Sequence, residues 1–169
     1  MRPTILAVDL GGTQIRAALC DPDGQIHRRT ARPTLAVEGP ESVIARIKDA
    51  VSEVLEGVPI EQITGVGIGS PGPLDPMQGV VISAPNLPGW HNVPLRDIVS
   101  AHVGRPAYLG NDANVAGLAE TLWGAARGER EVIYLTISTG VGSGIITDGR
   151  LVLGVRGLAG EAGHIVVMA

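Results

Sequence analysis

Phenylalanine is absent from this chain of 169 residues, and tryptophan and tyrosine occur only twice each. Aromatic residues make up 2% of the sequence but apolar residues 44%, so the core must consist mainly of Val, Ile, Leu and Ala. Such a composition favours buried sheets that are covered by helices. The length allows one or two compact units.

Basic residues, cysteines and long apolar runs are also scarce. The formal net charge is −4 without a basic cluster, which argues against nucleic acid as a partner. Cys20 is the only cysteine, which excludes a disulfide framework and a Cys-x-x-Cys metal site and favours a reducing cytoplasm. No apolar stretch reaches the roughly 18 residues that cross a bilayer, so no membrane is expected. The only lysine is Lys48, so any nucleoside triphosphate must be bound without a P-loop lysine.

Apolar periodicity predicts alternating groups of strands and helices. Strands are expected over 5–10, 14–20, 25–30, 63–69, 106–112, 131–138 and 164–168, a hairpin over 142–154, and helices over 40–57, 93–104 and 113–123. Residues 5–19 and 132–146 share one order, a strand, a glycine-rich turn with a threonine and a second strand, which indicates an internal duplication. A hinge near 124–130 predicts two domains, 1–123 and 124–169.

Each glycine-rich turn exposes backbone N–H groups that can form a concave nest for phosphate oxygens. The alternatives are a plain hairpin turn at Gly11–Gly12 and bulges at Gly140, Gly142 and Gly144. Asp9 ends the strand before the first turn, where a carboxylate repels phosphate unless Mg²⁺ stands between them. Asp9 is therefore predicted to organise a magnesium ion, through water, beside the Gly-Gly-Thr turn.

The stretch GIGSPG at 67–72 has the spacing of a dinucleotide-binding turn. That site needs a helix directly after the glycines. Pro71, Pro73 and Pro76 prevent such a helix. The segment is expected to be a rigid loop that lines a pocket, or a plain connection.

Polar residues near predicted strand ends are the candidate catalytic and binding groups. Asn111 and Asp112 stand where a strand passes into a helix, the edge at which α/β sheets bind ligands. Asp112 is the candidate base for phosphoryl transfer to an alcohol, and a helix N-cap is its alternative role. Glu161 and His164 are spaced three apart and could share one surface; the alternative is a solvated glutamate and a histidine with satisfied hydrogen bonds near a strand start. Trp90 is either the floor of a sugar pocket or a core residue.

Five motifs occur in the order and spacing of the ROK family of bacterial sugar kinases and sugar-responsive repressors: DLGGT, GSPGPLD, NDANVAGLAE, STGVGSGI and GLAGEAGH. Over essentially its whole length the chain resembles ROK glucokinases. The resemblance implies an α/β, actin-like (ribonuclease H-like) ATPase fold with an N-terminal lobe and an incomplete second lobe. It also implies ATP- and Mg²⁺-dependent phosphorylation of a hexose hydroxyl, in which sugar and ATP give sugar 6-phosphate and ADP.

The resemblance implies a role for each matching residue. Asp112 corresponds to the catalytic base and Asp9 to the acid that organises magnesium. The implied sugar-binding residues are Gly72, Asn86, Asn111, Asp112, Glu161 and His164. The implied contacts to the phosphates of ATP are Gly11, Gly12, Thr13, Thr139, Gly140 and Gly142.

Two departures from the family pattern matter. Repressors of the family carry a DNA-binding segment before DxGGT, but here the motif lies within ten residues of Met1, which favours the kinase branch. Many members continue after Glu-x-Gly-His into cysteines that bind Zn²⁺ with that histidine. The chain stops at Ala169, so the zinc site of His164 cannot be completed within it. A non-catalytic sugar-binding or regulatory remnant is therefore the alternative function. The sugar, the donor (ATP or polyphosphate) and the oligomeric state, commonly dimeric or tetrameric in the family, stay open.

Overall fold

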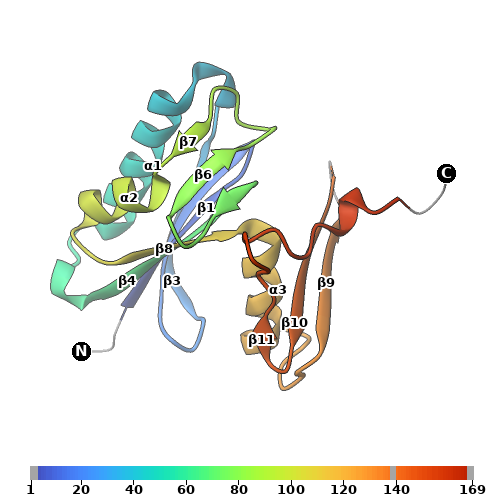
Figure 1. Ribbon diagram of the computed structural model, residues 1–169. Coiled ribbons are helices and arrows are strands. Elements are labelled where there is room, and N and C mark those ends of the chain that lie inside the picture. The colour runs from blue at the N-terminus through green and yellow to red at the C-terminus, as the bar shows by residue number, and fades with distance from the viewer. Residues whose placement is uncertain (1–3, 138–139, 167–169) are drawn as a thin grey trace. The chain divides into compact units, whose positions relative to one another are not determined.

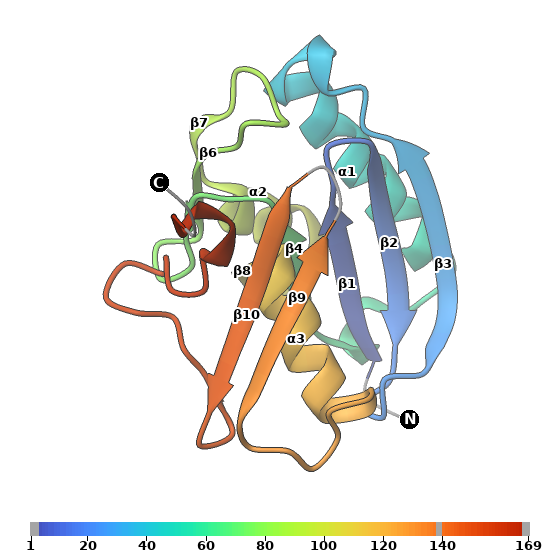
Figure 2. The same ribbon diagram turned by 90° about the vertical axis from the view of Figure 1, so that its right-hand side faces the viewer.

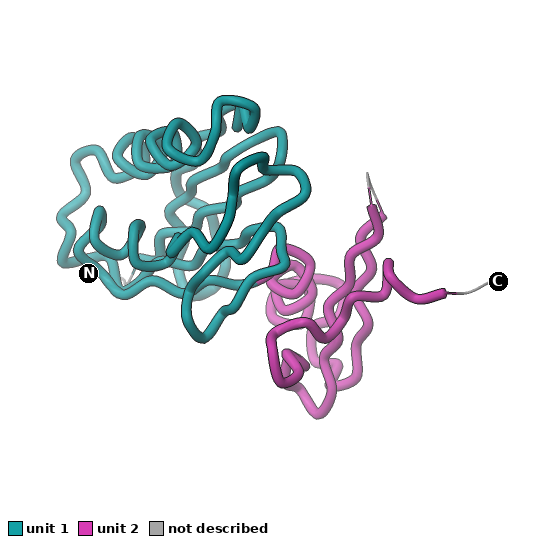
Figure 3. The backbone as a smooth tube through the Cα atoms, turned by 45° about the horizontal axis from the view of Figure 1, so that its top comes forward, with its two compact units in different colours: residues 1–110 teal, residues 111–169 magenta. Residues whose placement is uncertain are grey.

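The structure, a computed structural model, describes residues 4–137 and 140–166 (Figure 1). The chain forms two compact units, Met1–Gly110 and Asn111–Ala169 (Figure 3). The boundary falls before the third helix, whereas the sequence predicts a boundary between the lobes at 123/124. The location of the lobe boundary in a whole protein stays a prediction.

The first unit is built on a five-stranded sheet with the strand order β3-β2-β1-β4-β8. The strands are β1 (Thr4–Leu10), β2 (Gln14–Cys20), β3 (Ile26–Pro33), β4 (Ile63–Ser70) and β8 (Ala107–Asn111). The first three form an antiparallel meander, and β4 lies parallel to β1 on its other edge. The predicted opening meander is therefore confirmed.

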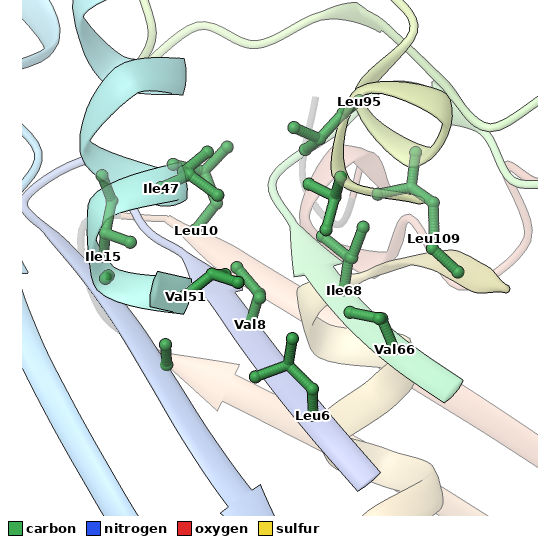
Figure 4. Packing of buried hydrophobic residues seen from close by; sticks show 14 of the residues in the cluster. Leu6, Val8, Leu10, Ile15, Ile47, Val51, Val66, Ile68, Leu95 and Leu109 are labelled. Carbon is green, nitrogen blue, oxygen red and sulfur yellow. The ribbon is translucent and has the colours of Figure 1, made fainter. Parts of the chain in front are cut away.

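Two helices, α1 (Pro40–Leu55) and α2 (Leu95–Val103), pack on this sheet through aliphatic side chains. Ile47 and Val51 of α1 lie over Val8 and Leu10 of β1, all within the buried core (Figure 4). Trp90 is 1% exposed and belongs to the same core, so its predicted alternative as the floor of a sugar pocket is wrong. Within the described ranges, none of the helices combines the length and the apolar character that a bilayer crossing requires.

A second, smaller sheet in this unit was not predicted. It contains the short strands β5 (Leu74–Asp75), β6 (Val80–Ser83) and β7 (His91–Val93) in the order β5-β6-β7. After β4 the chain passes into β5 and not into a helix, as the prolines require. No helix therefore follows the glycine spacing at 67–72, and this segment is not a dinucleotide-binding turn.

The second unit packs α3 (Asp112–Trp123) on a three-stranded antiparallel sheet of order β11-β10-β9 (Figure 2). Its strands are β9 (Val132–Ile137), β10 (Val141–Thr147) and β11 (Arg150–Leu151). The described residues also contain three short 3₁₀ helices: η1 (Ala36–Glu38), η2 (Ile60–Gln62) and η3 (Ala162–His164). The strand predicted over 164–168 is wrong at 164–166, because His164 ends η3 and the next two residues are in no regular element. Residues 167–169 lie outside the described residues.

Asp21, in the turn between β2 and β3, is expected to make stability depend on pH in the acid range. Asp21 is 4% exposed, and its carboxylate accepts hydrogen bonds from the N–H groups of Asp23 and Gln25 and from His27 Nε2, each at 3.0 Å. The Gln25 N–H, ahead of the bonds from His27 and Asp23, holds the pKa of Asp21 below its ordinary value. The unfolded chain therefore binds this proton more readily, and the stabilisation is lost as the pH falls below about 4.

Asp21→Asn should consequently show a shallower loss of thermal unfolding temperature than wild type when the pH is lowered from about 5 to 2. Asp23→Asn, in the same turn, is the control, because the Asp23 side chain is exposed. Equal acid slopes for wild type and Asp21→Asn would contradict the assignment.

Candidate functional site

The turn between β1 and β2 carries the first predicted phosphate loop, Gly11 to Thr13. Gly11 is used inside the turn: its N–H donates to Gln14 O at 2.9 Å, and its carbonyl accepts Thr34 Oγ1 at 2.7 Å. A side chain at Gly11 would come within 3.0 Å of Gln14 O. Within the described residues no acceptor is recorded for the N–H groups of Gly12 and Thr13, so these two are the donors that suit a phosphate.

Gly12 brings this loop against a segment that is predicted to bind sugar. A Cβ at Gly12 would lie 2.9 Å from Asn86 Cβ and 3.5 Å from Asn86 O. Asn86 is exposed, and Gly72, the other predicted sugar residue of this unit, is half-buried before a cis bond to Pro73. The first unit therefore places the predicted phosphate turn and Asn86 in direct contact.

Gly12→Ala is expected to destabilise the first unit by about 1–3 kcal/mol, because the added methyl overpacks the contact with Asn86. Gly67→Ala in β4 is the matched control, since no described atom lies within 4 Å of its Cβ position. Chemical unfolding of both variants measures the difference. Equal unfolding free energies would show that Gly12 is not held by packing.

Asp9, the predicted magnesium residue, faces away from the core of the first unit. Its Oδ2 accepts Arg16 Nη1 at 2.8 Å across the β1–β2 pair, and both side chains are about half-exposed. Such an exposed pair contributes only about 0–1 kcal/mol. One exposed carboxylate next to the glycine turn fits a hydrated magnesium ion better than a directly bound one, because Mg²⁺ keeps several waters in protein sites.

In the second unit, Asn111 and Asp112 occupy the junction at which β8 ends and α3 begins. Asn111 is the N-cap: its Oδ1 accepts the N–H groups of Ala113 at 3.1 Å and Asn114 at 3.2 Å. The capping role weighed for Asp112 thus belongs to its neighbour. Asp112 is exposed, and its Oδ1 accepts the Ala113 N–H at 2.9 Å.

The glycines of β10 divide into two kinds. Gly142 and Gly144 face α3: a Cβ at 142 would lie 3.1 Å from Ala113 Cβ, and one at 144 would lie 2.9 Å from Ala113 O. Close packing of helix on strand is a sufficient reason for both glycines. At Gly140 no described atom lies within 4 Å of the Cβ position, so a ligand can approach its backbone. Thr139, also a predicted phosphate contact, lies outside the described residues.

The segment that carries Glu161 and His164 is held along β10. Ser143 Oγ donates to Gly160 O, and a Cβ at Gly163 would collide with Val141 O. Glu161 and His164 are both exposed to solvent, with Oε2 and Nε2 3.9 Å apart, so the two side chains lie side by side and their role in binding stays a prediction.

The sequence analysis missed Ser143 and Gly160, whose hydrogen bond holds this segment, and the buried Asn114 beside them. Asn114 is 3% exposed, and its Oδ1 lies 3.6 Å from the Cβ position of Gly160 without a hydrogen-bond partner among the described residues. Ser143 could have been found in the sequence, because it is the polar residue between Gly142 and Gly144 in β10.

His164 was predicted as a zinc ligand. Among the described residues, no three His, Cys, Asp or Glu side chains gather in a way that could hold a metal ion. Cys20, the one thiol in the sequence, belongs to the other unit. The residues present do not fit zinc, and no chemical step is assigned to it.

A cavity of about 500 Å³ lies elsewhere in the first unit, lined by Met77, Arg96, Pro106 and Tyr108 among others. No predicted site residue lines it. The Arg96 guanidinium donates within the unit, to Met77 O at 2.9 Å and to the Asp97 carboxylate at 2.8 Å. Arg96 is thus already neutralised inside the unit, and the cavity is not assigned to the candidate site.

Known proteins resemble the chain over nearly all of its length. Glucokinase of Thermotoga maritima is 44% identical over 163 residues, which are 96% of this chain and 50% of that protein. The crystal structure of a ROK family glucokinase from Streptomyces griseus in complex with glucose and AMPPNP superposes with a TM-score of 0.88 at 38% identity, over 98% of this chain and 51% of that one. A xylose repressor of Caldicellulosiruptor bescii is 34% identical over 97% of this chain and 41% of the repressor.

The chain spans about half the length of the relatives it matches. The superposition on solved ROK sugar kinases gives it the expected α/β, actin-like ATPase fold. A sequence profile of the ROK family matches residues 5–169. The five motifs, the fold and this match agree, and the chain belongs to the ROK family.

Proposed function

We propose that the chain is the part of a glucokinase-like ROK kinase that transfers the terminal phosphoryl group of ATP to a hexose hydroxyl. The observation that carries the proposal is that two adjacent residues at the start of α3, Asn111 and Asp112, have different roles. Asn111 caps the helix, so the exposed Asp112 carboxylate is not needed as the cap. Relatives of the chain named glucokinase, one of them solved with glucose and AMPPNP, support a sugar and ATP as the ligands.

Asp112 is proposed to accept the proton of the sugar hydroxyl as that oxygen attacks phosphorus. A general base in hydrogen-bond reach contributes about 10²–10⁴ in rate. Because Asn111 Oδ1 is occupied by two backbone N–H groups, Asn111 would bind sugar through its NH₂ group as a donor. Glu161 would accept hydrogen bonds from sugar hydroxyls, with His164 beside it on the same surface.

The phosphates are proposed to lie against backbone N–H groups of Gly12, Thr13 and Gly140, with Gly11 and Gly142 shaping the two loops. Asp9 would hold magnesium through water, as its half-exposed carboxylate allows. Magnesium, when bound, neutralises charge on the transferring phosphates. Gly72 and Asn86 are proposed as the sugar-binding residues of the first unit.

A non-catalytic sugar-binding or regulatory role is the second candidate. It is favoured by the similarity to a xylose repressor and by the fact that the chain spans half of its relatives. This candidate predicts sugar binding without turnover, a combination that the kinase proposal excludes.

The test is ADP release by the purified chain of 169 residues with Mg·ATP and a panel of hexoses, alongside Asp112→Asn. Sugar binding is measured separately by calorimetry. Polyphosphate is tested as a second phosphoryl donor by measuring the sugar phosphate that forms. Sugar-dependent ADP release that the variant lacks supports the kinase and names its sugar. Binding without release from either donor supports the regulatory role.

A further inference from the structure

The first turn of α3 contains a buried amide whose oxygen is unused. Asn114 is 3% exposed, and among the described residues its Oδ1 has no hydrogen-bond partner. A buried polar atom that is left unpaired is destabilising, and few such atoms occur in native proteins. The helix does not need this side chain as a cap, because Asn111 fills that role. The reason for an asparagine at position 114 therefore lies outside the helix.

Asn114 lies where α3, β10 and the segment that carries Glu161 come together (Figure 1). A Cβ at Gly144 of β10 would lie 3.1 Å from Asn114 Cα, and the Cβ position of Gly160 lies 3.6 Å from Asn114 Oδ1. Ser143 Oγ donates to Gly160 O, so β10 already fixes the carbonyl group of this residue. The unused oxygen therefore lies next to the backbone that leads directly into Glu161.

This backbone has N–H groups that are also unused. Within the described ranges no acceptor is recorded for the N–H of Gly160 or of Glu161, whereas the N–H of Ala162 donates to Gly160 O at 2.8 Å. The two unused N–H groups belong to the peptide units on either side of Gly160 Cα, the atom from which its Cβ position is built. Because glycine has no side chain, none separates these groups from Asn114 Oδ1. An acceptor without a donor and donors without an acceptor are thus neighbours.

A hydrogen bond between them would join the two proposed sugar-binding parts of the second unit. Asn111 and Asn114 are three residues apart in α3, a spacing that places both on the same side of the helix. Glu161 directly follows Gly160. A bond from Asn114 to this backbone would therefore fix Glu161 relative to the helix start that carries Asn111 and Asp112.

We propose that Asn114 is a positioning residue for the sugar site. Its Oδ1 accepts a backbone N–H of Gly160 or Glu161 after a small rotation of the segment, and this bond holds the Glu161 carboxylate in place for the sugar. The buried oxygen then has the partner that it lacks in α3. The inference rests on the proposed function in one respect, that Glu161 binds the sugar; the bond between Asn114 and the segment does not depend on it.

Two substitutions at the same position test the proposal. Asn114→Leu removes the acceptor and keeps an unbranched Cβ, whereas Asn114→Asp keeps an oxygen acceptor in the same place. We expect Asn114→Leu to unfold at the wild-type temperature or above it, because an unpaired buried oxygen is lost, and yet to bind the sugar about five- to tenfold more weakly in calorimetric titration. Asn114→Asp should keep the wild-type affinity.

A purely structural asparagine would behave differently, because stability and affinity would then fall together in Asn114→Leu. That result overturns the proposal, and so does wild-type sugar affinity in Asn114→Leu. If the leucine variant does not fold, Asn114→Ala takes its place, since it removes the acceptor without adding volume. Its sugar affinity should fall by the same factor, and an unchanged affinity again overturns the proposal.

Amide hydrogen exchange separates this inference from the proposed function. In the absence of sugar, Asn114→Leu should speed exchange within 159–163 by about five- to tenfold, and Asn114→Asp should not, because the bond opens to exchange only where its acceptor is lost. If the chain binds no hexose, the proposed function fails, and exchange alone decides whether Asn114 holds the segment. Equal exchange in wild type and in both variants overturns the inference. Faster exchange in Asn114→Leu with unchanged sugar affinity overturns the role of Asn114 in the sugar site.

Discussion

Asp112→Asn is expected to lower kcat for sugar phosphorylation by roughly 10²–10⁴, the contribution of a positioned general base. The sugar KM should change little, because the asparagine keeps the size and the hydrogen-bonding oxygen of the aspartate. Asn also preserves an Oδ1 that can accept the Ala113 N–H, now bonded at 2.9 Å. The lost interaction of a carboxylate with the first turn of α3 is expected to cost about 0.3–1 kcal/mol. Steady-state kinetics and thermal unfolding of the same preparation measure both effects.

Asn111→Ala is the contrasting variant. It removes the cap whose Oδ1 accepts two backbone N–H groups, at an expected cost of about 0.5–2 kcal/mol in unfolding free energy. Asn111→Ala should therefore mainly lower the unfolding free energy, and Asp112→Asn should mainly lower kcat. Near-normal kcat in Asp112→Asn would exclude Asp112 as the base. A stability loss in Asp112→Asn as large as that in Asn111→Ala would instead make Asp112 structural.

The long elements could be predicted from the sequence because each has enough residues to show a period. Helix α1 repeats its apolar positions over four turns, β1 is a nearly continuous apolar run typical of a buried strand, and β2 has Ile15, Ala17 and Leu19 at every second position. The sheet β5-β6-β7 has strands of two, four and three residues, which are too short to reveal alternation. At 164–166 an apolar run misled the prediction, because composition without a period does not distinguish a strand from a turn.

The sequence was sufficient to predict which residues form the candidate site. It was not sufficient to predict the structural role of each one. Adjacent Asn111 and Asp112 are both good caps, and only the hydrogen bonds assign the cap to Asn111. The glycines Gly140 and Gly142 look alike in the sequence. They differ because Ala113, almost thirty residues earlier in the chain, packs against one and not the other. Such long-range contacts cannot be inferred from local spacing.

Gly160→Ala is expected to combine a conformational cost and a steric clash next to the site. Gly160 has φ +86°, where a side chain costs about 1–3 kcal/mol. The new Cβ would lie 2.9 Å from Ser143 O, a backbone atom of β10 that cannot move aside, and such overpacking adds about 1–3 kcal/mol. The hydrogen bond from Ser143 Oγ to Gly160 O would be displaced with it.

Because Gly160 directly precedes Glu161, the same substitution should weaken sugar binding by displacing the Glu161 carboxylate and the neighbouring His164. Gly149→Ala is the matched control: Gly149 has φ +72° in the turn between β10 and β11, but no described atom lies within 4 Å of its Cβ position. It therefore carries the conformational cost alone. Hydrogen exchange over 141–164 and calorimetric titration with the sugar, run on both variants, separate the two contributions. If Gly160→Ala behaves like Gly149→Ala in both measurements, the contact with Ser143 does not position the segment, and Glu161 must be held by other parts of the site.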